Sequence, residues 1–249
     1  MSSAPWQRRL YSLGLAHHDQ LNRAFGGGLP KGSVVLVEGP YGTGKSTLAG
    51  RIAYGLTEQS HEVTYLSTER PVSAFLDQMR SLSYDVTGAI LDRRLLYLFG
   101  DLSGFDSDGE PPQLLSRLTS SRRMWETDVA ILDTFGDILR YDPTFDVLAE
   151  QTDRRRAAQQ VISFFRRIAR GERTVILTVD PSGLAAETLE PFRAIADVLL
   201  ELTVTPGGRS VRRSIDVRRF VGMGQQVDDS IAFSIRPGIG LVVENRRVV

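Results

Sequence analysis

Residues 39–46 read Gly-Pro-Tyr-Gly-Thr-Gly-Lys-Ser, which matches the phosphate-binding pattern G-x-x-x-x-G-K-[ST] at every fixed position. The run before it, at 33–37, is β-branched and apolar, and residues 45–58 have the composition of a helix. A strand, a glycine-rich loop and a helix in this order are the context that the pattern requires. The alternative is an ordinary glycine-rich turn between a core strand and a core helix. Because pattern and context agree, the sequence predicts a site for ATP or a close relative.

The residue types of this loop suit a triphosphate. Glycines allow consecutive backbone N–H groups to turn inward, and the helix that follows presents the positive end of its dipole. Lys45 is predicted to reach the β- and γ-phosphates, which makes it a catalytic as well as a binding residue, and the Ser46 hydroxyl is predicted to bind Mg²⁺. The predicted cofactor-binding residues of the loop are Gly39, Tyr41, Gly42, Thr43, Gly44, Lys45, Ser46 and Thr47.

The composition is that of a globular protein, since 41% of the 249 residues are hydrophobic and 24% are charged. Thirty basic and thirty acidic residues cancel, so the overall charge does not favour nucleic acid or anionic lipid as a partner.

The absence of cysteine excludes disulfides and thiolate metal sites. No apolar run approaches the roughly 20 residues that span a bilayer, and the N-terminus lacks a signal-peptide core. We expect a cytoplasmic protein that reaches a membrane only through partners.

Apolar runs alternate with helical patterns along the chain. Strands are predicted at 33–38, 62–68, 95–98, 128–133, 174–179 and 198–204, and helices at 45–58, 71–82, 112–123, 152–170 and 187–196. Strands that alternate with helices of this length imply an α/β fold. We expect a mostly parallel central sheet with helices on both faces.

The C-terminal part has a different character. The residues Pro-Gly-Gly at 206–208 are typical of a hairpin turn that leads into a strand at 210–218. Short strands are predicted near 230–235 and 240–243. An antiparallel β extension over 205–249, at one edge of the parallel sheet, is therefore expected.

The chain contains no internal repeat, so we expect one domain over 1–249, with an N-terminal arm at 1–13. Two segments rich in turn-forming or polar residues, 100–112 and 135–152, are interpreted as mobile loops.

Two further strand ends carry carboxylates that a nucleotide site would use. The apolar strand 129–133 ends in Asp133, the Walker B form, which predicts a ligand of Mg²⁺. The alternative for Asp133 is a capping or turn residue after a buried strand. Glu69 follows the strand 62–68 and is predicted to orient and deprotonate an attacking water. The alternative for Glu69 is a surface pair with Arg70.

Other side chains have less specific patterns. Thr178 ends a strand and is interpreted either as a γ-phosphate sensor or as a buried polar group that needs a partner. Charge neutralisation during phosphoryl transfer usually needs a cation beyond Lys45. Arg218 and Arg219 are candidates for an arginine finger that reaches the site of a neighbouring subunit, and ordinary solvated or ion-paired arginines are the alternative.

Three segments of the sequence resemble those of a known family. Residues 25–33, Phe-Gly-Gly-Gly-Leu-Pro-Lys-Gly-Ser, resemble the G-G-G-[IL]-P-x-G-S lead-in of the KaiC-like ATPases in the RecA superfamily. Within that group, residues 63–69 and 78–86 are similar to segments of the archaellum accessory ATPases. The resemblance extends from about residue 14 to 245.

The resemblance implies a RecA-like core that assembles as a homo-oligomeric ring, a hexamer, with ATP and Mg²⁺ at the subunit interfaces. It also implies docking to the archaellum motor ATPase beneath a polytopic membrane platform protein, at the inner face of the membrane. In that family ATP occupancy matters for docking and turnover is slow. Lys45 matches the Walker A lysine, Asp133 the Walker B aspartate and Glu69 the catalytic glutamate.

The chain departs from the clock-type KaiC proteins at two places. Those proteins carry two adjacent glutamates at the end of the second strand, where this chain has Thr68 and Glu69. They also carry a lysine and an arginine that reach the neighbour's phosphates; Arg219 aligns with the lysine, but Val221 stands in place of the arginine. One trans-acting cation is therefore missing, which favours tight binding of ATP over rapid turnover.

Two alternative functions remain open. One is a KaiC-like signalling ATPase or autokinase outside motility. The other is a RadA-like DNA-dependent ATPase, which needs basic loops after the fourth and fifth core strands. The stretches at those places, 135–146 and 181–187, are acidic and apolar, so nucleic acid is not expected. The arginines at 154–156, 166, 167 and 170 are interpreted as a solvated or partner-facing helix surface.

Overall fold

The apolar runs of the sequence form parallel strands at the centre of the fold. The computed structural model describes residues 9–15, 18–102, 113–207, 210–223 and 225–244. The parallel strands are β3 (Val34–Glu38), β4 (Val63–Ser67), β5 (Leu95–Phe99), β6 (Val129–Asp133), β7 (Thr174–Val179) and β8 (Val198–Gly207). They lie in the order β8-β3-β7-β6-β4-β5, and each neighbouring pair is parallel. The predicted fold class is therefore confirmed.

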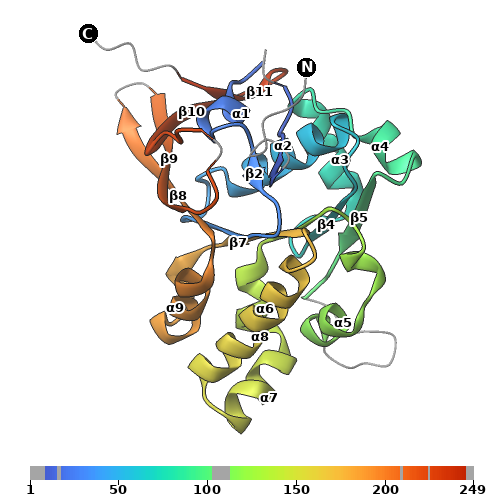
Figure 1. Ribbon diagram of the computed structural model, residues 1–249, viewed down its shortest axis with the longest axis vertical. Coiled ribbons are helices and arrows are strands. Elements are labelled where there is room, and N and C mark those ends of the chain that lie inside the picture. Colours follow the sequence, from blue (N-terminus) through green and yellow to red (C-terminus); the bar gives the residue numbers. More distant parts are fainter. Residues whose placement is uncertain (1–8, 16–17, 103–112, 208–209, 224, 245–249) are drawn as a thin grey trace.

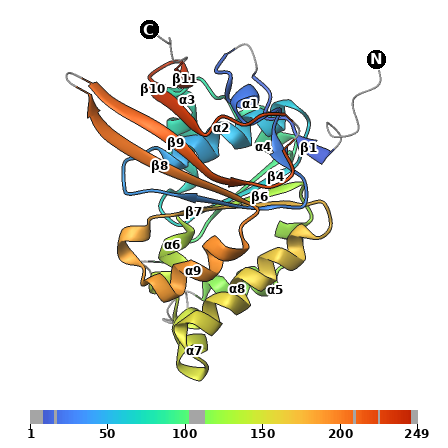
Figure 2. The ribbon, with the colours of Figure 1, turned by 60° about the vertical axis from the view of Figure 1, so that its left-hand side comes forward.

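Antiparallel strands extend this sheet on the side of β8. They are β9 (Ser210–Phe220), β10 (Ser230–Arg236) and β11 (Gly240–Val243), which bring the sheet to nine strands. The ribbon of β8 and β9 reaches beyond the body of the molecule in Figure 2. The predicted turn at 206–208 lies partly outside the described residues, but the two strands that it joins are present. A separate two-stranded sheet joins β1 (Leu10–Tyr11) to β2 (Leu29–Pro30).

Helices cover both faces of the sheet (Figure 1). One face carries α1 (Leu21–Ala24), α2 (Lys45–Glu58), α3 (Val72–Ser81) and α4 (Thr87–Leu91), and the other carries α5 (Leu114–Ser120), α6 (Phe135–Tyr141), α7 (Pro143–Gln151), α8 (Arg154–Ala169) and α9 (Ala186–Ile195). Side chains of β3 alternate between the two cores: Val35 and Val37 face the first, and Val34 and Leu36 the second. No helix among the described residues is long and apolar enough to cross a membrane.

The prediction of a mobile loop at 135–152 is wrong, because this segment forms α6 and α7. Asp142 separates the two helices and Pro143 begins the second, which interrupts the helical periodicity in the sequence. The Asp142 side chain accepts a hydrogen bond from the backbone N–H of Thr144 at 2.8 Å and so caps α7, and proline is favoured at a first helical position. The other predicted loop, 100–112, lies almost wholly outside the described residues.

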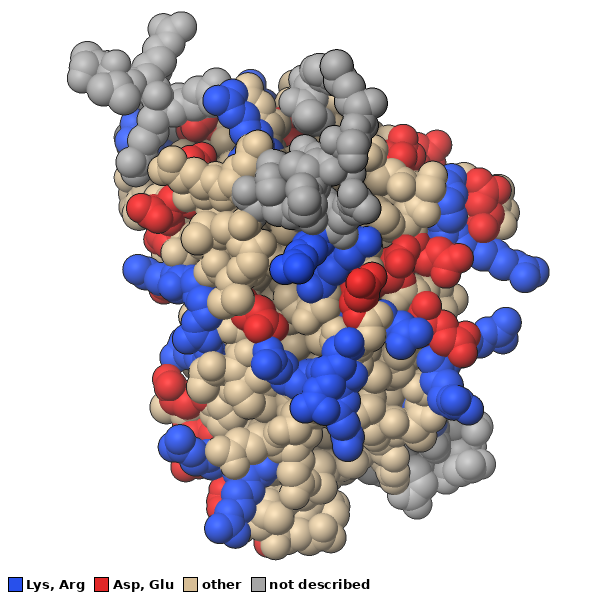
Figure 3. Space-filling view, viewed as in Figure 1, with Lys and Arg blue, Asp and Glu red and all other residues tan. Residues whose placement is uncertain are grey.

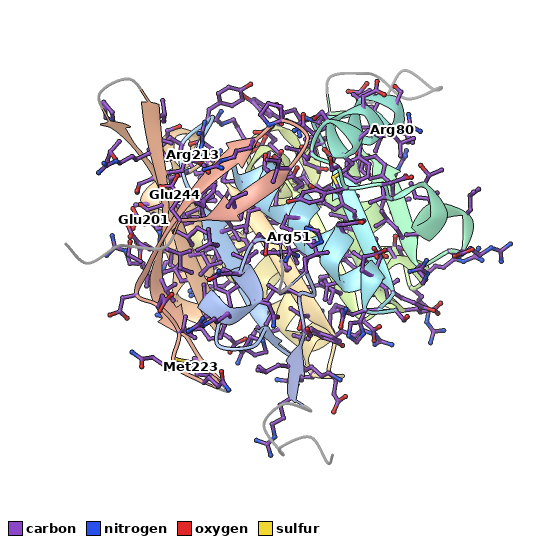
Figure 4. The ribbon with its side chains drawn as sticks, turned by 90° about the horizontal axis from the view of Figure 1, so that it is seen from above. Arg51, Arg80, Glu201, Arg213, Met223 and Glu244 are labelled. Atoms are coloured by element: carbon purple, nitrogen blue, oxygen red, sulfur yellow. The ribbon has the colours of Figure 1, made fainter. Side chains whose placement is uncertain are left out.

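A buried arginine ties the N-terminal segment to α2. Arg51 has no exposed surface, and its guanidinium donates to the carbonyl oxygens of Leu13 and Gly14 at 2.7 and 3.2 Å. It also forms an ion pair with Asp19, which is 3% exposed. The backbone oxygen of Asp19 in turn accepts from the N–H of Val243 in β11. Seen from above, Arg51 lies near the centre of the molecule (Figure 4), so it joins three parts of the chain around α2.

Candidate functional site

A cleft lies where the strands β3, β4, β6 and β7 end. Its volume of about 460 Å³ is within the range of pockets that bind small molecules. It is lined by Tyr41, Gly42, Gly44, Lys45, Ser46, Thr47, Glu69, Arg70, Thr134, Gly136, Asp137, Arg140, Tyr141, Asp180, Leu184 and Ile235. Ligands of open α/β sheets bind outside the carboxyl ends of the strands, and this cleft has that position.

The floor of the cleft is a loop of glycines followed by a helix N-terminus. Gly42 and Gly44 have φ angles of 80° and 103°, a region that side chains other than glycine rarely adopt. Gly44 is the N-cap of α2, and no side chain caps this helix end. The N–H groups of Lys45, Ser46 and Thr47 therefore have no partner within the helix. A set of N–H donors without intrahelical partners at a helix N-terminus fits a phosphate chain.

Three other predicted loop residues have different positions. A Cβ atom on Gly39 would lie 2.6 Å from the carbonyl oxygen of Leu202, so the chain is closely packed there. Thr43 is 2% exposed, and its hydroxyl donates to the carbonyl oxygen of Pro40 at 2.8 Å. Gly39 and Thr43 thus shape the loop from behind and do not line the cleft. Tyr41, at 86% exposure, lies at the cleft's mouth.

Lys45 places a charge at the centre of the loop. Its Nζ atom donates to the carbonyl oxygens of Gly39 and Pro40 at 2.6 and 2.9 Å. Burial lowers the pKa of this ammonium, and the nearby carboxylates, of which Asp180 and Asp133 act most strongly, oppose that effect. A partly desolvated ammonium interacts more strongly with an anion than one in bulk water does.

Asp133 is held rigidly beside the loop. Its carboxylate is 2% exposed and accepts hydrogen bonds from Ser46 Oγ at 3.1 Å, Tyr65 OH at 3.0 Å and Thr178 Oγ1 at 2.8 Å. Thr178 Oγ1 also accepts from the backbone N–H of Thr134, so Thr178 acts here as a buried polar group that orients Asp133. Burial and the adjacent Asp133 raise the pKa of Tyr65 well above its ordinary value. Tyr65 therefore stays a neutral donor.

Ser46 and Asp133 could supply part of the ligand set of a Mg²⁺ ion. Hydroxyl and carboxylate oxygens are the ligands that Mg²⁺ prefers, and the two side chains are in direct contact. The described residues contain no group of three or more His, Cys, Asp or Glu that would hold a metal by themselves. The pair therefore suits an ion that phosphate oxygens and water also coordinate.

Glu69 reaches the same cleft from the end of β4. Its side chain is exposed and lines the cleft with Lys45. The Ser67 hydroxyl accepts from the backbone N–H groups of Glu69 and Arg70 at 3.3 and 3.2 Å, which fixes the turn after the strand. The position agrees with that expected of a general base, and the role itself remains a prediction.

We expect Glu69→Gln to abolish most ATP hydrolysis while MgATP affinity changes by less than about threefold, because removal of a general base usually costs 10² to 10⁴ in rate. Single-turnover hydrolysis and equilibrium binding would be measured on the same preparation. Glu150→Gln, on the exposed surface of α7, is the matched control. An unchanged hydrolysis rate in Glu69→Gln would remove Glu69 from the mechanism.

Arg219 and Arg218 do not line the cleft of their own chain. Arg219 Nη1 donates to the carbonyl oxygens of Arg193 and Ala196, both at 2.8 Å, and so caps the C-terminal end of α9. Arg218 Nε donates to a carboxylate oxygen of Glu201 at 2.7 Å. A role for either arginine in a neighbouring subunit's site stays a prediction.

Sequence reasoning missed several residues that face the cleft. They are Asp137, Arg140, Tyr141, Asp180 and, behind Asp133, Tyr65. Three of them belong to α6, a segment that the sequence predicts as a loop. A tyrosine within the strand predicted at 62–68 is the one signal in the sequence for a buried hydrogen-bond donor there.

The fold and the cleft define a phosphate-loop protein with the RecA-like α/β core. A comparison with protein families agrees, because the KaiC ATPase family model matches residues 18–247. The chain belongs to the KaiC ATPase family.

Within this family the chain is similar to archaeal flagellar proteins. It is 29% identical over 227 residues to the archaeal flagellar ATP-binding protein FlaH of Methanocaldococcus jannaschii, covering 91% of this chain and 92% of the relative. The crystal structure of flagellar accessory protein FlaH from that organism has a TM-score of 0.84 at 28% identity, covering 95% and 99% of the two chains. A KaiC-like protein from Pyrococcus horikoshii, with a TM-score of 0.69 at 19% identity, shares the fold. The resemblance expected from the sequence is confirmed.

Proposed function

We propose that this protein is an ATP-binding accessory component of an archaellum motor. The observation that carries the proposal is a complete phosphate loop facing Asp133, in a chain that is similar to FlaH over 91% of its length. The loop N–H groups and Lys45 bind the phosphates, and Ser46 and Asp133 hold Mg²⁺. The presence or absence of the γ-phosphate of the bound nucleotide then determines the state of the protein.

The proposed mode of action is assembly gated by nucleotide. The chains form a ring, a hexamer, in which the cleft of one chain faces the next. A ligand shifts an equilibrium only by its preference for one state, and ATP across a subunit interface supplies such a preference. The loaded ring then docks to the motor ATPase beneath the membrane platform protein. The protein is thus cytoplasmic and peripheral to the membrane through these partners.

Slow hydrolysis follows from the charges near the cleft. Rapid phosphoryl transfer usually uses an arginine or lysine from a neighbouring subunit in addition to the loop lysine. Val221 stands where the second such cation is expected, and Arg219 is engaged with the end of α9. A long-lived ATP-bound state suits a regulatory ring better than a power stroke.

The pattern of surface charge does not favour DNA as a partner. Arg154, Arg156 and Arg166 of α8 form ion pairs with Asp146, Asp153 and Asp197. Acidic side chains also lie among the basic ones on the face shown in Figure 3. Paired arginines contribute less to binding a phosphate backbone than free ones do.

The assembly proposal is tested by measuring molar mass by light scattering with MgATP, with MgADP and without nucleotide. We expect MgATP to shift the protein to a closed oligomer and to raise its affinity for the motor ATPase by at least about fivefold, a common size for coupling between sites. The molar mass and the motor affinity of Lys45→Ala should not change when MgATP is added. Equal mass and equal motor affinity in all conditions would contradict nucleotide gating. Strong MgATP binding without any motor affinity would favour a signalling role outside motility.

A further inference from the structure

Arg140 is a cation in the cleft whose role the phosphate-loop pattern does not assign. It lies on α6, which begins two residues after Asp133. Gly136, Asp137 and Tyr141 of the same helix also line the cleft. This spacing places the four residues on one helical face, so that face forms the wall opposite the phosphate loop.

The guanidinium of Arg140 is anchored at one side only. Its Nε atom donates to the carbonyl oxygen of Gly183 at 3.1 Å, and Nη1 donates to the Tyr141 hydroxyl at 3.2 Å. Its Cζ atom lies 5.5 Å from the centre of the Tyr141 ring. Nη2 lies against Gly183, and neither its N–H groups nor the second N–H of Nη1 has a hydrogen-bond acceptor among the described residues. The guanidinium thus has hydrogen-bonding capacity that the protein does not use.

Gly183 lies directly beside this guanidinium. A Cβ atom on Gly183 would overlap the end of the Arg140 side chain. The guanidinium therefore lies in the space that any other residue at 183 would fill. The backbone at Gly183 is not in the left-handed region, so alanine there would displace Arg140 without straining the chain.

The charges around Arg140 also indicate that it acts on an anion. The other charged side chains that line the cleft are Lys45, Glu69, Arg70, Asp137 and Asp180. Burial raises the pKa of Asp137, and Arg140 is the strongest of the cations that counter this shift. A triphosphate would meet three carboxylates here, so a cation on the same wall is needed. Arg70 has no side-chain hydrogen bond among the described residues, whereas Arg140 is held in place.

We propose that Arg140 contacts the terminal phosphate of a nucleoside triphosphate in the cleft of its own chain. This inference rests on the proposed nucleotide site and adds a specificity residue to it. The planar guanidinium is suited to bidentate contact with phosphate oxygens, and its anchors at Gly183 and Tyr141 reduce the entropy lost on binding. Arg140 thereby distinguishes the triphosphate from the diphosphate.

The test compares the affinities of MgATP and MgADP by calorimetry in the wild type, Arg140→Ala and Gly183→Ala. We expect Arg140→Ala to weaken MgATP about tenfold or more, the effect of one lost charge-assisted contact, and MgADP by less than about twofold. Gly183→Ala should reproduce this pattern, and the double variant should lose no more than either single variant. Arg155→Ala, on the exposed face of α8, is the control and should bind both nucleotides as the wild type does.

Any result other than this selective loss of MgATP affinity overturns the inference. Unchanged MgATP affinity in Arg140→Ala would show that the guanidinium does not touch the ligand. Equal losses for MgATP and MgADP would show that Arg140 supports the cleft and does not read the terminal phosphate. Failure of the wild type itself to bind MgATP would overturn the nucleotide site and this inference together, so the two failures are distinguishable.

Discussion

Lys45→Ala is expected to weaken MgATP binding by at least about 100-fold, because it removes charge-assisted hydrogen bonds to the phosphates from a partly desolvated position. The fold should survive, since the side chain is not part of either hydrophobic core. Calorimetry or equilibrium dialysis with MgATP measures the effect, and circular dichroism checks the fold.

Lys31 provides the matched control for this substitution. It is the other lysine of the chain, and its Nζ atom lies 4.9 Å from the centre of the Tyr11 ring, outside the cleft. Lys31→Ala should bind MgATP within about twofold of the wild type. Wild-type affinity in Lys45→Ala would mean that the ammonium does not bind phosphate, and the assignment of the loop would fail.

Arg51→Met is expected to lower the free energy of unfolding by about 3–5 kcal/mol. The substitution keeps much of the volume but leaves the buried Asp19 carboxylate without its partner. It also leaves the carbonyl oxygens of Leu13 and Gly14 without their donor. Urea denaturation followed by circular dichroism measures the change.

Two further variants separate the ion pair from general packing. Arg155→Met changes an exposed arginine of α8 and should alter stability by less than about 0.5 kcal/mol. Asp19→Ala should be destabilising by itself, and the double variant of Arg51 and Asp19 should lose less than the sum of the two single losses. A loss below about 1 kcal/mol in Arg51→Met would contradict the role of Arg51 as the link between the N-terminal segment and α2.

The sheet and the phosphate loop could be predicted because their signals are local. A parallel strand such as β7 is buried along its whole length and mostly apolar, and the predicted bounds 174–179 agree with the structure. Residues 39–46 carry their pattern in consecutive positions, so no knowledge of the rest of the chain is needed. Asp133 could be placed because a parallel strand delivers its last residue to the same edge as the loop.

The remaining parts depend on contacts between distant segments. Tyr65 orients Asp133 across a separation of 68 residues, and no local pattern marks such a bond. Arg140 has its place because Gly183, 43 residues further along, leaves space for it. Arg51 looks like a surface residue of an amphipathic helix until the N-terminal segment covers it. The roles of Tyr65, Arg140 and Arg51 depend on tertiary packing, so the periodicity of the sequence could not show them.

The central claim is that the loop around Lys45 encloses the phosphates of one MgATP. The most direct measurement is a calorimetric titration of the folded wild-type protein with ATP in the presence of Mg²⁺. The account predicts saturable binding of one nucleotide per chain that Lys45→Ala removes and Lys31→Ala preserves. No binding to the folded wild-type protein at millimolar MgATP, or binding that Lys45→Ala leaves intact, would contradict it.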